Sequence, residues 1–307
     1  MTMVRYMEIR PNVKRIQVAN RSKSLVEESA KNMSKSKEQI RDSIKGALYG
    51  FAIGDAMGAT TEFMKKEEIQ RRYGKVDDIL GGGWLNLKPG EVTDDTQMSI
   101  CVMNALMCST NELEFVKAVR NGFIDWYRSN PPDVGNQCRI GIERLIAGNP
   151  LHSFECPKAL GNGSLMRALP CALISNVHYN VLQGRVTHPN GRCTYMIHQY
   201  TDLIESVVIY GDEISLPTCL EEPTSFVDYT YNNAVYWAAY CKTFKDCIIG
   251  AVNHGGDADT IAAIAGSISG AKHGYQSIPK EWVEKLDPTV CNKLDEFLDY
   301  IIKIRNL

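Results

Sequence analysis

The chain has 307 residues, of which 44% are hydrophobic and 23% are charged, and its formal net charge is −2. This balance is typical of a globular protein with a large core, and it argues against a general affinity for nucleic acid or membranes. No apolar run has the length of a membrane-spanning helix, and the N-terminus lacks the apolar segment of a signal peptide. The ten cysteines form no CxxC pair, which fits reduced thiols, so we expect a cytoplasmic protein.

Residues 1–36 differ from the rest of the chain. They contain eight basic and three acidic residues, and their apolar residues follow no long period. We interpret this segment as a basic N-terminal extension, which is either a solvated tail or an arm that docks on a partner protein.

A helical pattern begins at Ser36. Ser36 and Gln39 have the spacing of a capping box, and Ile40, Ile44 and Leu48 recur at helical intervals. Strand-like alternation is scarce, so the sequence predicts one all-helical domain over residues 37–307. The other helices are expected at about 66–74, 95–109, 112–128, 136–147, 163–176, 191–209, 230–241, 243–252, 259–273 and 289–304.

The segment "GEVTDDTQMSI" (residues 90–100) places Asp94 and Asp95 side by side after Thr93, at the start of an expected helix. Helix capping explains one of the two aspartates, because one side chain is enough to bind the free N–H groups. At a helix start both carboxylates can be directed into a common space, where a cation would relieve their repulsion. Capping and metal binding are equally good interpretations of this segment alone.

The segment "NHGGDADTIAAIAGSISGAKHG" (residues 253–274) repeats this arrangement with Asp257, Asp259 and Thr260. Carboxylate and hydroxyl oxygens are hard ligands, so the two segments together favour a site for Mg²⁺ or Mn²⁺. The helix that follows is expected to let a second helix approach closely, because it is rich in small residues: Ala262, Ala263, Gly266, Ser267, Ser269, Gly270 and Ala271.

Five segments in order resemble the motifs of the ADP-ribosylglycohydrolase family, particularly its bacterial branch, which includes dinitrogenase reductase-activating glycohydrolase. They are "GALYGFAIGDAMGATTEF", "GEVTDDTQMS", "DVGNQCRIGI", "GNGSLMRALP" and "VNHGGDADTIAAIAGSISGA". The resemblance implies an all-helical fold that binds two divalent cations and removes ADP-ribose from modified protein side chains. The bacterial form "DVGNQCR" favours arginine as the modified residue.

The resemblance also implies roles for individual residues. The metal ligands would be Thr93, Asp94, Asp95, Asp257, Asp259 and Thr260. Glu62 would act on the attacking water, and Asp133 and Asn136 would lie beside the bond that is cleaved. The ADP-ribose would be bound by Gly161, Asn162, Gly163, Ser164, Leu165, Met166 and His188. The aromatic residue that stacks on adenine has three candidates, Phe226, Tyr229 and Tyr231.

Other interpretations remain open. Without the resemblance, Glu62 is better explained as a surface residue and Asp133 as a helix cap. The "DADT" segment partly resembles the motif of aspartyl-phosphate phosphotransferases, which would require an α/β domain. The chain could also bind ADP-ribose without turnover, or neutralise an ADP-ribosylating toxin by contact, in which case the N-terminal extension could reach the toxin.

Overall fold

The computed structural model describes residues 34–149, 155–215 and 225–307, and all of its regular elements are helices. These are α2 (Lys37–Gly58), α3 (Lys66–Tyr73), α4 (Asp94–Cys108), α5 (Glu112–Arg128), α6 (Asn136–Ile146), α7 (Leu169–Leu173), α8 (Val177–Arg185), α9 (Gly191–Ile209), α10 (Phe226–Tyr240), α11 (Phe244–Val252), α12 (Ala258–His273), η1 (Tyr275–Ser277), α13 (Lys280–Lys285) and α14 (Pro288–Arg305). The predicted all-helical fold is confirmed, and the α/β domain of the phosphotransferase alternative is absent from these residues.

The predicted extension lies almost entirely within residues 1–33, outside the described residues, so its role stays a prediction. Within the ranges described above, no helix combines the length and the apolar character needed to cross a membrane.

Most helices begin and end within one or two residues of the predicted positions. Helix α2 starts with the predicted capping box, in which the Gln39 N–H donates to Ser36 Oγ at 3.2 Å and the Ser36 N–H donates to Gln39 Oε1 at 2.8 Å. Helix α10 starts four residues earlier than predicted, because the Ser225 side chain accepts from the Asp228 N–H and caps it there.

The prediction of a helix over residues 163–176 is wrong for most of its length. Residues 161–162 form a bend, residues 163–167 form turns, and α7 has only five residues, with a proline in its first turn. Arg167 bonds to groups outside this segment, which stabilises the turns at the expense of a helix. Two short helices, α8 and α13, were not predicted.

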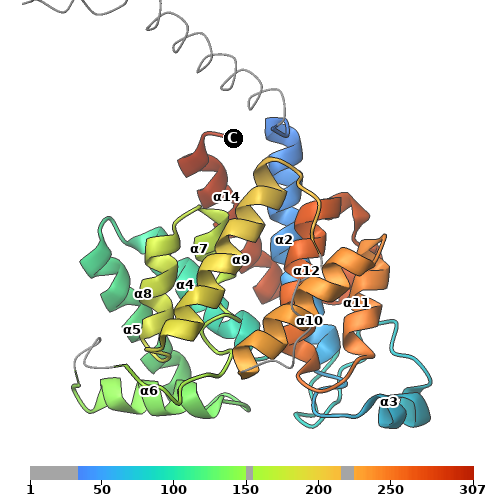
Figure 1. Ribbon diagram of the computed structural model, residues 1–307, viewed down its shortest axis with the longest axis horizontal. Helices are drawn as coiled ribbons and strands as arrows, with labels where there is room; N and C mark the ends of the chain where they lie inside the picture. The colour runs from blue at the N-terminus through green and yellow to red at the C-terminus, as the bar shows by residue number, and fades with distance from the viewer. Residues whose placement is uncertain (1–33, 150–154, 216–224) are drawn as a thin grey trace, which may run out of the picture.

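Helices α2 and α12 lie side by side at the centre of the molecule (Figure 1). Four glycines at intervals of four residues face α12, and a Cβ atom added to any of them would lie 2.0–2.4 Å from a carbonyl oxygen. The glycines are Gly46, Gly50, Gly54 and Gly58, and the oxygens belong, in that order, to Gly270, Gly266, Ala262 and Ala258. The two helices are therefore antiparallel and in backbone contact, as the small residues of α12 predicted.

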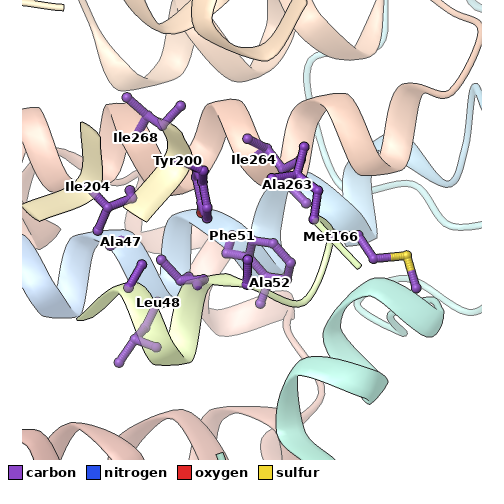
Figure 2. Packing of buried hydrophobic residues seen from close by; sticks show 14 of the residues in the cluster. Ala47, Leu48, Phe51, Ala52, Met166, Tyr200, Ile204, Ala263, Ile264 and Ile268 are labelled. Carbon is purple, nitrogen blue, oxygen red and sulfur yellow. The ribbon is translucent and has the colours of Figure 1, made fainter. Parts of the chain in front are cut away.

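The rest of the core packs around this pair. Figure 2 shows part of this core, with Leu48 and Phe51 from α2, Tyr200 from α9, and Ile264 and Ile268 from α12. Because α2 and α12 are antiparallel, the C-terminal end of α2 lies beside the N-terminal end of α12. The acidic segment at the start of α12 is thereby brought next to Glu62, four residues after the end of α2.

Candidate metal centre and substrate cavity

A cavity of about 340 Å³ lies at this end of the α2–α12 pair. Its wall includes six acidic side chains from four parts of the chain: Glu62, Asp94, Asp95, Asp133, Asp257 and Asp259. Asp94 and Asp95 are the first two residues of α4, while Asp257 is the N-cap of α12. The two acidic helix starts that were singled out in the sequence thus face the same space.

The tightest acidic group consists of Glu62, Asp257 and Asp259, which offer one carboxylate oxygen each within 4.8 Å of one another. Thr260 connects this group to Asp95, because its hydroxyl lies 3.3 Å from Asp95 Oδ2 and 3.3 Å from Asp257 Oδ1. The other oxygen of Asp95, Oδ1, is buried and has no hydrogen-bond partner among the described residues.

The electrostatics of the cavity favour a cation. Burial raises the pKa of Asp94, Asp95 and Asp259 well above the usual value, and repulsion from neighbouring carboxylates adds to the shift. Burial also raises the pKa of Glu62 to about 8 and that of Asp257 to about 6. A divalent cation would stabilise the charged forms of these groups and would satisfy the free oxygen of Asp95. The side chains present therefore fit an ion that prefers oxygen ligands.

A further carboxylate, Asp55 of α2, orients the first acidic segment. Its side chain is fully buried and accepts hydrogen bonds from the Thr93 N–H at 3.0 Å, the Thr93 hydroxyl at 2.8 Å and the Thr96 N–H at 3.0 Å. Asp55 thus caps α4 from another helix. Thr93 is itself the N-cap of α4, and its oxygen also accepts from the Asp95 N–H at 3.4 Å. One lone pair of this oxygen is left for a metal, but Thr93 is absent from the cavity wall. The sequence analysis missed Asp55, although a lone acid within an apolar helix was a usable signal.

Asp133 and Asn136 form another part of the cavity wall. Asp133 is not a helix cap, because the N-cap of α6 is Gly135. Burial raises the pKa of Asp133. Asn136 is the first residue of α6, and its Oδ1 accepts from Arg139 Nη2 at 2.8 Å.

The glycine-rich turn lines the cavity with four of its predicted residues: Gly161, Asn162, Gly163 and Met166. Ser164 and Leu165 are fully buried behind them. Asn162 contacts the acidic group directly, since its Nδ2 donates to Asp257 Oδ2 at 2.6 Å. This amide therefore fixes the orientation of Asp257.

His188 packs against the turn. A Cβ atom at position 163 would lie 2.8 Å from His188 Cε1 and 2.6 Å from Cys138 Sγ, so a larger residue there would require these side chains to shift. The His188 ring lines the cavity, and its Nδ1 lies 2.8 Å from the Thr187 hydroxyl. Burial, together with the nearby Arg167, lowers the pKa of His188 to about 3, so the ring is neutral at physiological pH.

Arg167 holds this region together and was not predicted. It is fully buried and donates to Gln183 Oε1 at 2.8 Å, to the Thr187 hydroxyl at 2.7 Å and to the carbonyl oxygen of Gly163. Its guanidinium carbon lies 4.5 Å from the centre of the Phe123 ring. A single arginine can bond several segments at once because its donors form a rigid fork.

Of the three aromatic candidates for adenine stacking, Phe226 lines the cavity. Its ring is 47% exposed and stacks on Tyr229, with ring centroids 6.1 Å apart. Tyr229 and Tyr231 are absent from the cavity wall. Phe226 is therefore the candidate that can contact a ligand directly.

The chain is similar to several known proteins over most of its length. The family model for ADP-ribosylglycohydrolase matches residues 36–230 and 217–306. ADP-ribosyl-[dinitrogen reductase] glycohydrolase of Rhodospirillum rubrum is 33% identical over 290 residues, which cover 87% of this chain and 98% of that protein. ADP-ribosylarginine hydrolase Tri1 of Serratia proteamaculans is 30% identical over 285 residues, which cover 80% of this chain and 75% of that protein.

A solved structure with a similar fold is titled "ADP-ribosylglycohydrolase-related protein complex". It has a TM-score of 0.71 and 26% sequence identity, and the match covers 85% of this chain and 97% of that one.

Proposed function

Because the chain belongs to the ADP-ribosylglycohydrolase family, we propose that it hydrolyses the bond between ADP-ribose and an arginine side chain of a modified protein. The main support is the convergence of two acidic helix starts and the glycine-rich turn on one cavity. The names of two similar proteins, a dinitrogen reductase glycohydrolase and an ADP-ribosylarginine hydrolase, support a protein substrate modified on arginine.

The proposed ligands for two divalent cations, Mg²⁺ or Mn²⁺, are Thr93, Asp94, Asp95, Asp257, Asp259 and Thr260. Such ions, when bound, supply positive charge that orients the ribose hydroxyls and favours ionisation of water. Asp55 and Asn162 hold two of these aspartate segments in place through the hydrogen bonds described above.

The reaction breaks the bond between the anomeric carbon of ribose and a guanidine nitrogen, through an oxocarbenium-like transition state. Glu62 is the proposed general base, because it is buried at the cavity wall beside Asp257 and Asp259. It takes a proton from the water whose oxygen forms the new bond to the anomeric carbon. The guanidine nitrogen takes the electron pair of the broken bond and gains a proton from solvent. Asp133 is proposed to bind the departing guanidinium, and Asn136 to lie beside the same bond. The products are ADP-ribose and unmodified arginine.

The remaining part of the cavity suits the ADP portion of the substrate. Gly161 and Gly163 leave the backbone of the turn accessible to a diphosphate, and Phe226 offers an exposed ring for adenine. His188 would contribute a neutral ring nitrogen, which can bind a ribose or phosphate oxygen only as a hydrogen-bond donor.

A panel of substrates tests the proposal. The purified protein is assayed with Mg²⁺ or Mn²⁺ on ADP-ribosyl-arginine, ADP-ribosyl-serine, a nucleobase adduct and poly(ADP-ribose). We expect kcat/KM to be highest for the arginine linkage. A preference for another linkage would reject the arginine specificity. Binding of ADP-ribose without turnover of any substrate would instead indicate a non-catalytic binder.

A further inference from the structure

Two exposed aromatic side chains, Phe63 and Trp84, lie at the Glu62 side of the cavity. Phe63 lines the cavity and is 65% exposed, while Trp84 is 49% exposed. The ring centroids are 5.5 Å apart, with the planes tilted by 45°. Large apolar side chains exposed together beside a ligand cavity indicate a surface that is covered when a partner binds.

The backbone holds both rings in this exposed position. Phe63 has a left-handed conformation with φ of 60°, which is rare for an aromatic residue, and its N–H donates to the carbonyl oxygen of Gly256 at 2.6 Å. Gly83 precedes Trp84 with φ of 67°, and a Cβ atom there would lie 2.1 Å from the carbonyl oxygen of Ala59. Strained or closely fitted backbone of this kind is commonly found at functional sites.

Trp84 also contacts the proposed general base. Its indole Nε1 donates to Glu62 Oε2 at 2.6 Å. This hydrogen bond uses one of the two carboxylate oxygens of Glu62. Trp84 therefore connects the exposed rim to the group that carries out the chemistry. An occupant that contacts the rings lies next to Glu62.

Phe63 in the cavity wall and Trp84 on Glu62 indicate which part of a substrate the pair meets. Glu62 is assigned to the anomeric carbon, whereas Gly161, Gly163 and Phe226 are assigned to the ADP portion, so Phe63 and Trp84 lie at the reaction centre. The group attached to the anomeric carbon lies at the same centre. For an arginine substrate this group is a planar cation on a polypeptide, and planar guanidinium groups stack favourably on aromatic rings.

We propose that Phe63 and Trp84 form the docking surface for the arginine-bearing segment of the protein substrate, and that Trp84 is a positioning residue for Glu62. This inference rests on the proposed hydrolysis of ADP-ribosyl-arginine. The acidic side chains beside the pair favour a cationic segment over a neutral or acidic one.

The docking role is tested with two substrates, free ADP-ribosyl-arginine and a purified protein carrying ADP-ribose on one arginine. Phe63→Asn removes the ring, and asparagine can adopt the same left-handed backbone conformation, because it tolerates positive φ. We expect the fold-decrease in kcat/KM for the protein substrate to be about ten times that for free ADP-ribosyl-arginine, because the ring contacts the polypeptide as well as the guanidinium. Tyr240→Ala is the control, since Tyr240 is also 65% exposed but absent from the cavity wall.

The positioning role is tested with Trp84→Phe, which keeps a ring and loses the N–H donor. We expect kcat to fall about tenfold or more on both substrates, with KM for the protein substrate changed by less than about threefold. Trp84→Gln retains an N–H donor, and partial recovery of kcat in this variant would support the hydrogen bond.

Three results would overturn the inference, and they differ in what else they reject. Equal losses on both substrates in Phe63→Asn would reject the docking surface, and wild-type kcat in Trp84→Phe would reject the positioning role. Neither result affects the proposed hydrolysis. Absence of turnover of either substrate by the wild-type protein would reject the hydrolysis and the inference together. As a control, the affinity of each variant for ADP-ribose is measured by calorimetry, and an unchanged affinity shows that the cavity is intact.

Discussion

The glycine contact between α2 and α12 allows a prediction in which packing reverses the usual effect of a substitution. In an exposed helix, Gly→Ala stabilises by about 1 kcal/mol, because alanine has the higher helix propensity. At Gly54 the new Cβ atom would lie 2.0 Å from the carbonyl oxygen of Ala262, whereas Cβ atoms in proteins essentially never come closer than 3.0 Å to such an atom. The two helices would have to separate by about 1 Å, the difference between these distances.

This separation affects both stability and the site. Overpacking of a core typically costs about 1–3 kcal/mol, and here the clash is with backbone that cannot rotate away. We therefore expect Gly54→Ala to lower the free energy of unfolding by about 3 kcal/mol, which corresponds to a fall in Tm of about 6–12 °C. Because Gly54 precedes Asp55, and Ala262 lies three residues after Asp259, we also expect weaker binding of Mn²⁺.

The assay combines thermal unfolding with calorimetric titration of Mn²⁺. Gly122→Ala in α5 is the matched control, because the nearest atom to its Cβ would be the Cys101 side chain at 3.3 Å. We expect this control to change the free energy of unfolding by less than about 1 kcal/mol. If Gly54→Ala were as stable as Gly122→Ala and bound Mn²⁺ normally, the close contact would not determine the geometry of the site.

Four further predictions concern the acidic cavity. Glu62→Gln should lower turnover by about 10²-fold or more while the affinity for ADP-ribose, measured by calorimetry, changes by less than about tenfold; comparable losses in both would mean that Glu62 mainly maintains the structure of the site. Asp55→Asn should destabilise the protein by about 1–3 kcal/mol in chemical unfolding and weaken Mn²⁺ binding, because the amide brings N–H donors against the N–H groups of Thr93 and Thr96; the exposed Asp299→Asn, which should have no effect, is the control. Removal of divalent cations with EDTA should abolish activity, and excess Mg²⁺ or Mn²⁺ should restore it. In EDTA the pKa of Glu62, about 8, lies above its value in the unfolded chain, so the stabilisation from its protonated form is complete at low pH and is lost as the pH rises through 8. The Tm in EDTA should therefore fall from pH 5 to pH 8, and more steeply than in Mn²⁺; an equal slope in both would contradict a cation bound at these carboxylates.

The differences between the predicted and observed helices follow from the range of the interactions involved. Helix α2 could be predicted because its signals, the Ser36–Gln39 capping box and the apolar spacing, lie within a few residues of each other. The turns over residues 163–167 could not be predicted, because Arg167 stabilises them through Gln183 and Thr187, which lie 16 and 20 residues away in the sequence. Local periodicity contains no information about such partners.

By itself, the sequence determined the helical class and the acidic starts of α4 and α12. The small residues of α12 also predicted that a second helix packs closely against it. Each of these depends on residue type and local spacing. Only the tertiary structure decided that this partner is α2, that Asp55 caps α4, and that Trp84 reaches Glu62. The physical reason is that a carboxylate at residue 62 and another at residue 257 can share a cation only after the antiparallel packing of two helices has brought them within 4.8 Å.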